Sequence, residues 1–163
     1  MGLHLETERL IVREWRESDI GSYLTLSKDV GYNVFSTPGC YLVKDDFEAL
    51  AKIRARIALF NTNGLGKFPV FLKTSGEFLG TAGFDPYTLD GSGEVELGYR
   101  LCLEHWGKGY ATEAVRAMLQ WAYGALDLNR VEAELDTRNA ASARVLEKLG
   151  FEREGLRRED CVL

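Results

Sequence analysis

The segment between residues 94 and 136 restricts the fold most strongly, because a strand, a glycine turn, a long helix and a second strand follow one another there. Polar and apolar side chains alternate over residues 94–101 and again over 130–136, which predicts two half-buried strands. A helix is predicted over residues 110–126, and its apolar stripe contains Ala114, Val115, Met118, Leu119 and Ala122. A strand–helix–strand unit of this kind implies a parallel crossover, so we expect an α/β domain.

Further strands and helices are predicted on both sides of this unit. The strands lie at residues 10–15, 68–73, 78–87 and 151–157, with turns at 74–77 and 90–93. The helices lie at residues 18–28, at 43–61 and from Asn139 or Ser142 to Gly150. In the helix at 43–61 the buried face is predicted to contain Phe47, Leu50, Ala51, Ile57 and Ala58. Residues 31–41 are predicted to be irregular.

Length and composition exclude several classes of protein. The chain has 163 residues, which suits one domain, and 20 basic against 25 acidic residues give a net charge of −5. This acidic balance argues against nucleic-acid binding, and no apolar run approaches the ~18 residues of a membrane span. We expect a cytoplasmic protein with reduced thiols, because the cysteines are few, odd in number and scattered: Cys40, Cys102 and Cys161.

The glycine turn before the long helix favours binding of a pyrophosphate. Gly107 and Gly109 flank Lys108 directly before the predicted helix start. Unpaired amides at a helix N-terminus attract anions, and glycines allow close approach to the backbone. A P-loop is excluded because no Gly-Lys-Ser/Thr closes the turn, and a dinucleotide-binding fold fits poorly because antiparallel strands precede it.

Five motifs in order extend this interpretation to nearly the whole chain. They are Thr7-Glu8-Arg9-Leu10-Ile11-Val12-Arg13, Gly80-Thr81-Ala82-Gly83-Phe84, Glu96-Leu97-Gly98-Tyr99, Trp106-Gly107-Lys108-Gly109-Tyr110-Ala111-Thr112-Glu113-Ala114 and the run from Asn139 to Phe151. With these motifs the chain, from about residue 5 to residue 158, resembles the GNAT acetyltransferase superfamily. Within it, the chain is most similar to the ribosomal-protein N-terminal-alanine acetyltransferase-like branch.

The resemblance implies a single acyl-CoA N-acyltransferase domain over residues 1–163, with a central, twisted, mostly antiparallel mixed sheet flanked by helices. It implies acetyl-CoA as cosubstrate and no metal. It assigns CoA contacts to the strand residues Tyr99, Arg100, Leu101, Cys102 and Leu103, to the turn residues Gly107, Lys108, Gly109, Tyr110, Ala111 and Thr112, and to the helix-start residues Asn139 and Ser142.

The chain departs from the family pattern at three places. Trp106 opens the turn where the superfamily usually has Gln or Arg, and Leu146 stands where many members carry a Tyr that protonates the leaving thiolate. The chain also stops at Leu163, so the final strand of the family is expected to be lacking. An unpaired sheet edge there favours a homodimer or a partner strand.

Catalysis needs a neutral amine and a proton for the thiolate. We expect Glu96 to be the general base, directly or through water; the alternative is a sheet-face carboxylate or a counter-ion of the substrate amine. Glu94 is a weaker candidate, and Asp85 and His105 are weaker still, with His105 alternatively a surface residue beside the turn. Ser142 is expected to replace the missing acid, although a serine near a helix start is as often a cap. Backbone amides near Leu101 and Cys102 are expected to face the thioester carbonyl if the strand bulges or splays. We expect Cys102 itself to be a buried side chain rather than an acetyl-carrying nucleophile.

These observations together predict an N-acetyltransferase that moves an acetyl group from acetyl-CoA to a primary amine by direct attack. The acceptor stays open between a protein N-terminus and a small-molecule amine. Residues 31–41 and the helix that follows are expected to shape its site. The alternative is a catalytically silent acyl-CoA-binding or regulatory module, which the Leu146 departure favours. No nucleic acid and no membrane are expected as partners.

Overall fold

Six strands form one sheet in sequence order, β1 to β6, in the computed structural model. The structure describes residues 2–35, 41–86, 95–126, 128 and 130–157. Neighbouring strands are antiparallel except β5 and β6, which are parallel. The strands are β1 (His4–Glu6), β2 (Leu10–Arg13), β3 (Gly66–Leu72), β4 (Phe78–Pro86), β5 (Val95–Leu101) and β6 (Val131–Glu132). This confirms the predicted mixed, mostly antiparallel sheet and its parallel crossover.

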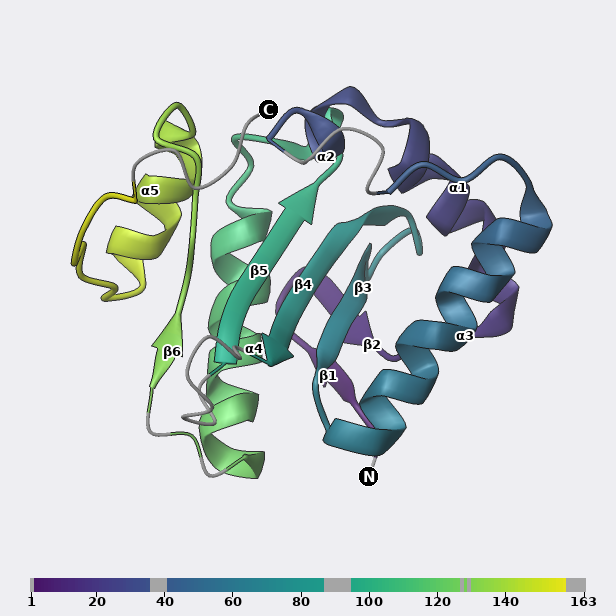
Figure 1. Ribbon diagram of the computed structural model, residues 1–163, viewed down its shortest axis with the longest axis horizontal. Helices are drawn as coiled ribbons and strands as arrows, with labels where there is room; N and C mark the ends of the chain where they lie inside the picture. The colour runs from purple at the N-terminus through teal and green to yellow at the C-terminus, as the bar shows by residue number, and fades with distance from the viewer. Residues whose placement is uncertain (1, 36–40, 87–94, 127, 129, 158–163) are drawn as a thin grey trace.

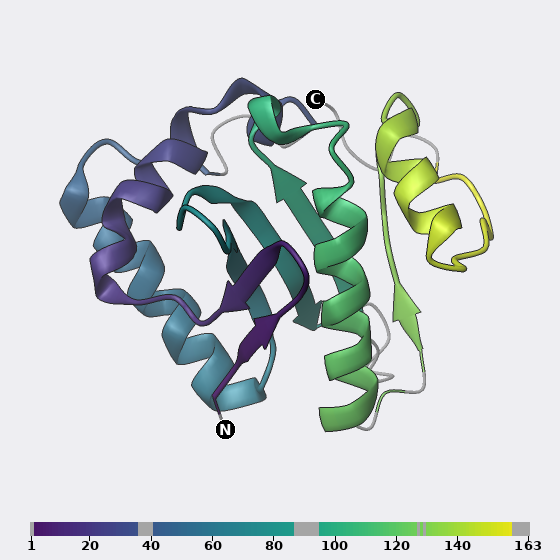
Figure 2. The same ribbon diagram turned by 180° about the vertical axis from the view of Figure 1, so that it is seen from behind.

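Helices cover both sides of the sheet. The long helix α4 packs against one face, and α5 lies against α4 beside the chain that follows β6 (Figures 1 and 2). Helices α1 and α3 pack against each other, and α3 also contacts β3. The helices are α1 (Ile20–Lys28), α2 (Val30–Asn33), α3 (Asp46–Asn63), α4 (Tyr110–Ala125) and α5 (Ala140–Lys148), with 3-10 turns η1 (Glu17–Asp19) and η2 (Leu103–His105).

Two buried clusters hold these layers together. The larger lies between the sheet and α4 and includes Val12, Phe84, Leu97 and Met118. The predicted stripe of α4 is confirmed: Ala114, Val115, Met118 and Ala122 are buried, and Leu119 packs against the cluster. The smaller cluster joins α1, α2 and α3 around Trp15, Tyr23, Tyr32 and Ile53. Within the described residues, no helix is both long enough and apolar enough to cross a membrane.

The predicted buried face of α3 is wrong at three of its five residues, whereas Leu50 and Ile57 are partly buried. Phe47 is 80% exposed, and Ala51 and Ala58 are also exposed. The buried positions are instead Ala49, Ile53 and Phe60, with Ile57 packed beside them. This spacing gives a helical stripe that differs from the predicted one by a rotation about the helix axis. The ends agree better, because Asp45 caps the start and Gly64, with a φ of 68°, ends the helix.

Other segments differ from the prediction for physical reasons. The sequence pattern missed the three-residue strand β1 and the one-turn helix α2, both too short for a periodicity to show. Strand β6 is two residues long: its pairing with β5 ends at Glu132, and within the described part of the chain the residues that follow pair with no other strand. Residues 151–157 are irregular, not a strand; the ion pairs Arg130–Glu154 and Arg157–Glu134 hold them. The predicted turn at 90–93 and residues 158–163 lie outside the described residues.

Candidate active site

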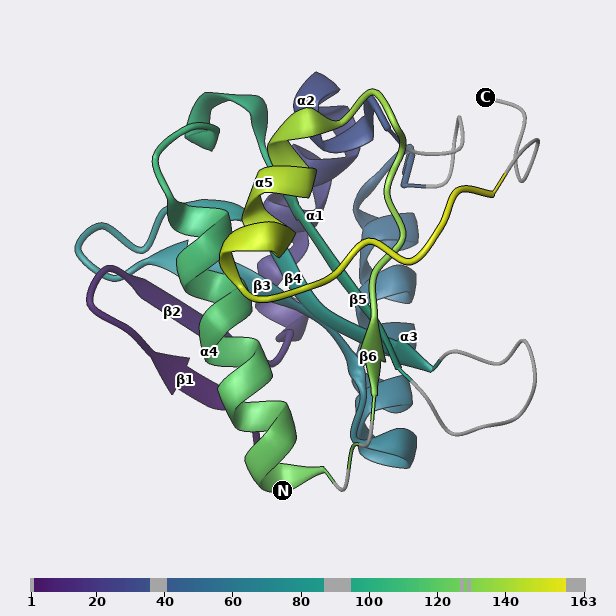
Figure 3. The same cartoon turned by 90° about the vertical axis from the view of Figure 1, so that its left-hand side faces the viewer.

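Strands β5 and β6 separate soon after they meet. Their parallel pairing consists of Val95 with Val131 and Glu96 with Glu132. Beyond these pairs the two chains diverge toward the end of the sheet where α4 begins (Figures 1 and 3). Among the described residues, no strand covers the edge of β5 from residue 97 onward. This V-shaped opening is the splay that the sequence analysis required for backbone groups of β5 to face a ligand.

The hydrogen-bond pattern shows which β5 groups face the splay. The Cys102 amide donates to the Leu79 carbonyl on β4 at 2.9 Å, so by alternation residues 98 and 100 also face β4. The backbone groups of residues 97, 99 and 101 therefore face the splay. The carbonyl of Leu101 already accepts a 2.8 Å hydrogen bond from the Trp106 indole.

Two further hydrogen bonds reduce the number of residues between 99 and 103 whose backbone amides can bind a ligand. The Leu103 amide is engaged by the Asp29 carboxylate at 3.1 and 3.3 Å. The amides of Cys102 and Leu103 are thus both used inside the protein. The expectation that the Cys102 amide faces a ligand carbonyl is wrong for this reason, whereas the Leu101 amide points into the splay.

The glycine turn has the geometry of an anion cradle. Gly107 and Gly109 have φ values of 74° and 80°, in the left-handed region that favours glycine. Gly109 is the N-cap of α4, and no side chain caps this helix start in the described structure. The amides of the first helical residues are those that an α-helix leaves unpaired, and they carry the positive end of the helix dipole. They are the amides of Tyr110, Ala111 and Thr112.

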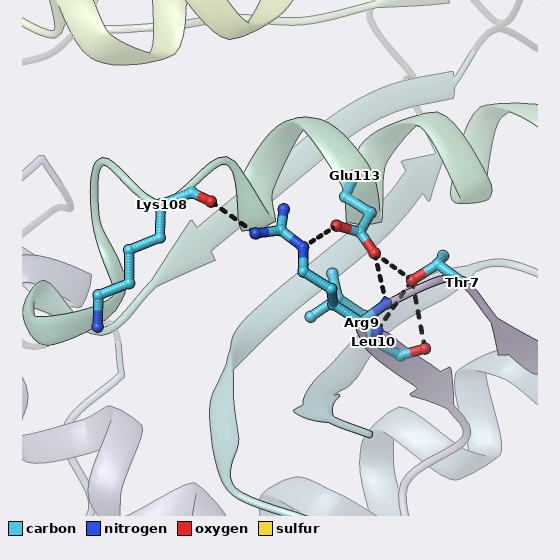
Figure 4. Close-up of polar contacts among 5 residues, drawn as sticks. All are labelled: Thr7, Arg9, Leu10, Lys108 and Glu113. Atoms are coloured by element: carbon cyan, nitrogen blue, oxygen red, sulfur yellow. Dashed lines mark hydrogen bonds and ion pairs between the residues drawn. The ribbon is translucent and has the colours of Figure 1, made fainter. Parts of the chain in front are cut away.

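A polar network fastens this turn to the N-terminal hairpin (Figure 4). The Glu113 carboxylate accepts hydrogen bonds from the Arg9 amide at 2.9 Å, the Arg9 Nε at 2.7 Å and the Thr7 hydroxyl at 2.5 Å. The Arg9 Nη1 donates to the Lys108 carbonyl at 3.0 Å, and its guanidinium lies 4.6 Å above the Tyr110 ring. Burial alone would raise the pKa of Glu113, but these hydrogen bonds outweigh it and lower the pKa.

A shallow surface hollow of about 370 Å³ adjoins the turn. It is lined by Glu8, Arg9, Gly109, Thr112, Glu113, Arg116 and Lys148. Arg9 is paired with Glu113, so Arg116 and Lys148 face one further carboxylate, Glu8, and leave the start of α4 a small excess of positive charge. The cradle therefore combines outward backbone amides, flexible glycines and nearby cations, which fits a pyrophosphate.

Helix α5 reaches the splay from the other side. Asn139 caps α5 by accepting a hydrogen bond from the Ser142 amide at 3.0 Å. The Tyr99 hydroxyl on β5 donates to the Ser142 carbonyl at 3.0 Å and so links β5 to α5. Burial raises the pKa of Tyr99. Leu146 is buried in the main cluster and offers no hydroxyl.

Glu96 lies in a charged cluster on the face of β5 opposite α4. It is the register partner of Asp85 on β4, and the Asp85 carboxylate is 2.5 Å from the Lys67 ammonium. Burial raises the pKa of Glu96; the positive charge of Lys67 opposes this shift, and the charges of Glu134 and Asp85 add to it. A carboxylate whose pKa is raised is a stronger base.

The segment around α2 covers the same face near the end of β5. The buried Tyr32 hydroxyl is 2.7 Å from the Thr81 hydroxyl on β4, and Arg100 donates to the Tyr32 carbonyl at 3.2 Å. The Arg100 guanidinium lies 5.3 Å from the centre of the Tyr41 ring. Residues 36–40 of the predicted acceptor segment lie outside the described residues.

The remaining candidates have different outcomes. His105 is buried within η2, with 3% of its surface exposed, so the alternative that it is a surface residue is wrong. Cys102 is 1% exposed and burial raises its pKa to about 12, which agrees with a packing role. Glu94 lies outside the described residues. Sequence reasoning missed the Thr7–Arg9–Glu113 network, because residues this far apart leave no local pattern.

Comparisons with known proteins agree with this fold and site. The acetyltransferase (GNAT) domain model matches residues 9–152. An uncharacterised N-acetyltransferase of Bacillus licheniformis, p20, is 33% identical over 161 residues, which cover 95% of this chain and 85% of the relative. The structure of a ribosomal-protein-S5-alanine acetyltransferase from Vibrio fischeri is similar with a TM-score of 0.80 and 25% identity, over 94% of this chain and 85% of that chain.

A further solved structure, of the ribosomal L7/L12 α-N-protein acetyltransferase RimL in complex with coenzyme A, shares the fold. Its TM-score is 0.79 at 19% identity, and the similarity covers 94% of this chain and 86% of that chain. The family match over most of the sequence confirms the predicted family. The chain belongs to the GNAT acetyltransferase family and is an acetyl-CoA-dependent acyltransferase.

Proposed function

We propose that this enzyme transfers an acetyl group from acetyl-CoA to a primary amine by direct attack of the amine on the thioester carbon. The main support for the proposal is the splay between β5 and β6. The two strands stop pairing after Glu96, and the gap between them opens toward the uncapped start of α4. Bound acetyl-CoA supplies an activated acetyl group as a thioester. The chain's own residues bind it, orient it and move protons.

Two parts of the site hold the cosubstrate in this proposal. The amides of Tyr110, Ala111 and Thr112 bind the pyrophosphate at the positive end of α4, and Gly107 and Gly109 let it approach the backbone. The splay-facing backbone groups of residues 97–101 bind the pantetheine arm as a further strand would. The Leu101 amide, which points into the splay, donates to the thioester oxygen and stabilises the negative charge that develops there.

Glu96 removes the proton from the attacking amine, directly or through one water. Its raised pKa makes it a better base than an exposed carboxylate, and the Lys67–Asp85 pair beside it keeps the cluster from accumulating a larger negative charge. The amine enters from the face of β5 that carries Glu96, because the base must lie next to the amine. The same face carries Arg100, and the α2 segment beside it borders the acceptor site. A cationic amine is attracted by Glu96 and Asp85 before it loses its proton.

The departing sulfur receives a proton at the α5 side of the splay. The Ser142 hydroxyl is the proposed donor, since the buried Leu146 has none, and it takes up a proton from water as it gives its own to the sulfur. The hydrogen bond from the Tyr99 hydroxyl to the Ser142 carbonyl fixes the first turn of α5 against β5 and so holds Ser142 in place. Asn139 caps the same turn, so a binding contact and a capping role coexist there.

The proposed acceptor class is a primary amine, presented either at a protein N-terminus or on a small molecule. The similar structures named as ribosomal-protein acetyltransferases support the first form. The charged cluster around Glu96 suits either form, because it recognises an ammonium group rather than a side chain. The chain is proposed to carry out this reaction in the cytoplasm without a metal in the transfer step.

The test follows free thiol release from acetyl-CoA with a panel of peptides that have free N-termini and of small amines. We expect saturable release with at least one acceptor. Glu96→Gln and Ser142→Ala should lower kcat by about 10²-fold while the Kd for CoA changes little. Glu132→Gln, which removes a carboxylate committed to Arg130 at 2.7 Å, and Ser22→Ala are matched controls that should keep kcat.

Two outcomes would contradict the proposal in different ways. CoA binding without turnover across the whole panel favours the catalytically silent module instead. Full kcat in Glu96→Gln or in Ser142→Ala removes that residue from the mechanism while leaving the reaction class intact.

A further inference from the structure

Three metal-ligating side chains meet beside the glycine turn, outside the acetyl-transfer site. Glu77 ends the turn between β3 and β4, and Glu104 and His105 belong to η2. The ligand atoms of the three side chains all lie within 4.8 Å of one another. The His105 Nε2 lies 3.4 Å from the Glu104 carboxylate and 3.7 Å from the Glu77 carboxylate.

The second observation that points to a ligand is the burial of His105 and the missing hydrogen-bond partner of its Nε2. Its side chain is 4% exposed, and Nε2, the atom nearest both carboxylates, has no hydrogen-bond partner. Among the residues that the structure describes, Nε2 is the one buried side-chain nitrogen or oxygen in this condition. Buried polar atoms are nearly always satisfied, so an unpartnered imidazole nitrogen aimed at two carboxylates requires an explanation.

We propose that Glu77, Glu104 and His105 bind a zinc ion. A neutral imidazole nitrogen with a free lone pair and two carboxylate oxygens are ordinary zinc ligands at about 2.0–2.2 Å. Tetrahedral ligands at that distance are roughly 3.3 Å apart, close to the two separations from Nε2. The carboxylates are partly exposed, with 48% and 71% of the side-chain surface accessible, so water completes the coordination.

A zinc ion at this position would join the β3–β4 turn to η2. Because η2 leads directly into Trp106 and the glycine turn, the ion would stabilise the approach to the cradle without touching the reacting atoms. This structural site is separate from the transfer step, for which no metal is proposed. The family resemblance implied no metal, and no local spacing marks these ligands in the sequence, because Glu77 lies on a different turn of the chain from Glu104 and His105.

The experiment titrates zinc into chelator-treated, full-length protein by calorimetry and follows thermal unfolding with and without zinc. We expect one zinc per chain and a zinc-dependent rise in Tm. Glu77→Gln and Glu104→Gln change accessible side chains and should fold normally, and each should weaken zinc binding by at least about tenfold. His105→Asn should do the same, but the two glutamate variants keep the test valid if that buried variant fails to fold.

His4 provides the matched control. The chain has two histidines, and His4 forms a similar but exposed contact with Glu6 at 3.2 Å. His4→Asn should bind zinc as the wild type does. Cobalt substituted for zinc should show no thiolate charge-transfer band, which excludes cysteine ligands. Three results would overturn the proposal: no saturable zinc binding, an unchanged zinc affinity in both glutamate variants, or loss of zinc binding in His4→Asn. His105 would then be only one member of an ion-pair cluster.

Discussion

The guanidinium of Arg9 is bound to the carboxylate of Glu113 at 2.7 Å and, through Nη1, to the carbonyl of Lys108 at 3.0 Å (Figure 4). One side chain from the N-terminal hairpin thus contacts both the glycine turn and the first turn of α4. The pair is partly buried, with 42% of Arg9 and 19% of Glu113 exposed. The shape of the proposed CoA cradle therefore depends on a contact between residues that are 104 positions apart in the sequence.

Replacing Arg9 with Met should loosen the cradle. The variant keeps an apolar stem over Tyr110 but loses the charged hydrogen bonds to Glu113 and Lys108, so we expect a stability loss of about 1–2 kcal/mol. We also expect a several-fold rise in the Kd for CoA, measured by calorimetry. Arg54→Met is the matched control, because Arg54 makes a comparable two-pronged pair with Glu17 on the exposed surface. Equal effects of both variants on CoA affinity would show that Arg9 has no special role in the cradle.

Replacing Gly109 with Ala tests whether the left-handed turn matters for the ligand or only for the fold. A non-glycine residue at a φ of 80° costs about 1–2 kcal/mol, and the added Cβ would lie 3.4 Å from the Arg9 Nη2. Gly64→Ala, at a φ of 68° at the end of α3, should cost a similar amount of stability. The two variants should differ in CoA affinity, which falls in Gly109→Ala alone. A normal Kd for CoA in Gly109→Ala would argue against the cradle.

Sequence reasoning located the elements that carry a strong periodicity or a defined end. The α4 stripe and the start of α5 at Asn139 are local features, and both are present as predicted. The Asp45 cap and the Gly64 end of α3 are local features as well, although the prediction began that helix at residue 43. The contacts that shape the site are not local. The burial of His105 and the Arg9–Glu113 pair depend on how separate elements pack. The length of β6, two residues, depends on its pairing with β5 and cannot be predicted from its own sequence.

Cys102 should be dispensable for turnover. It is 1% exposed, and burial, with the negative charges of Asp29 and Glu104 nearby, raises its pKa to about 12. The thiol is therefore protonated near neutral pH and is a poor nucleophile. We expect Cys102→Ala to retain kcat and to lose about 1 kcal/mol of stability. Peptide mapping after iodoacetamide treatment should find Cys102 unmodified in the folded enzyme. Rapid alkylation at Cys102, or inactivity of a folded Cys102→Ala variant, would revive the covalent route.

Glu96→Gln should lower kcat but raise the free energy of unfolding at neutral pH. Because the folded state raises the pKa of Glu96 above its ordinary value of 4.5, the folded protein holds this proton more tightly than the unfolded chain. The wild type therefore loses stability as the pH rises from the unfolded pKa through the folded pKa, and the Gln variant lacks this loss. Below the unfolded pKa the two proteins should be similarly stable, whereas at neutral pH the variant should be the more stable.

Denaturant unfolding of both proteins at pH 4 and at pH 7.5 measures this difference, and thiol release at pH 7.5 measures kcat. Glu132→Gln is the control for a neighbouring carboxylate on the adjacent strand. A Glu96→Gln variant that is less stable than the wild type at pH 7.5 would mean that attraction to Lys67 outweighs burial. In that case Glu96 is held as an ion-pair partner, and its basicity would no longer support a role in deprotonating the amine.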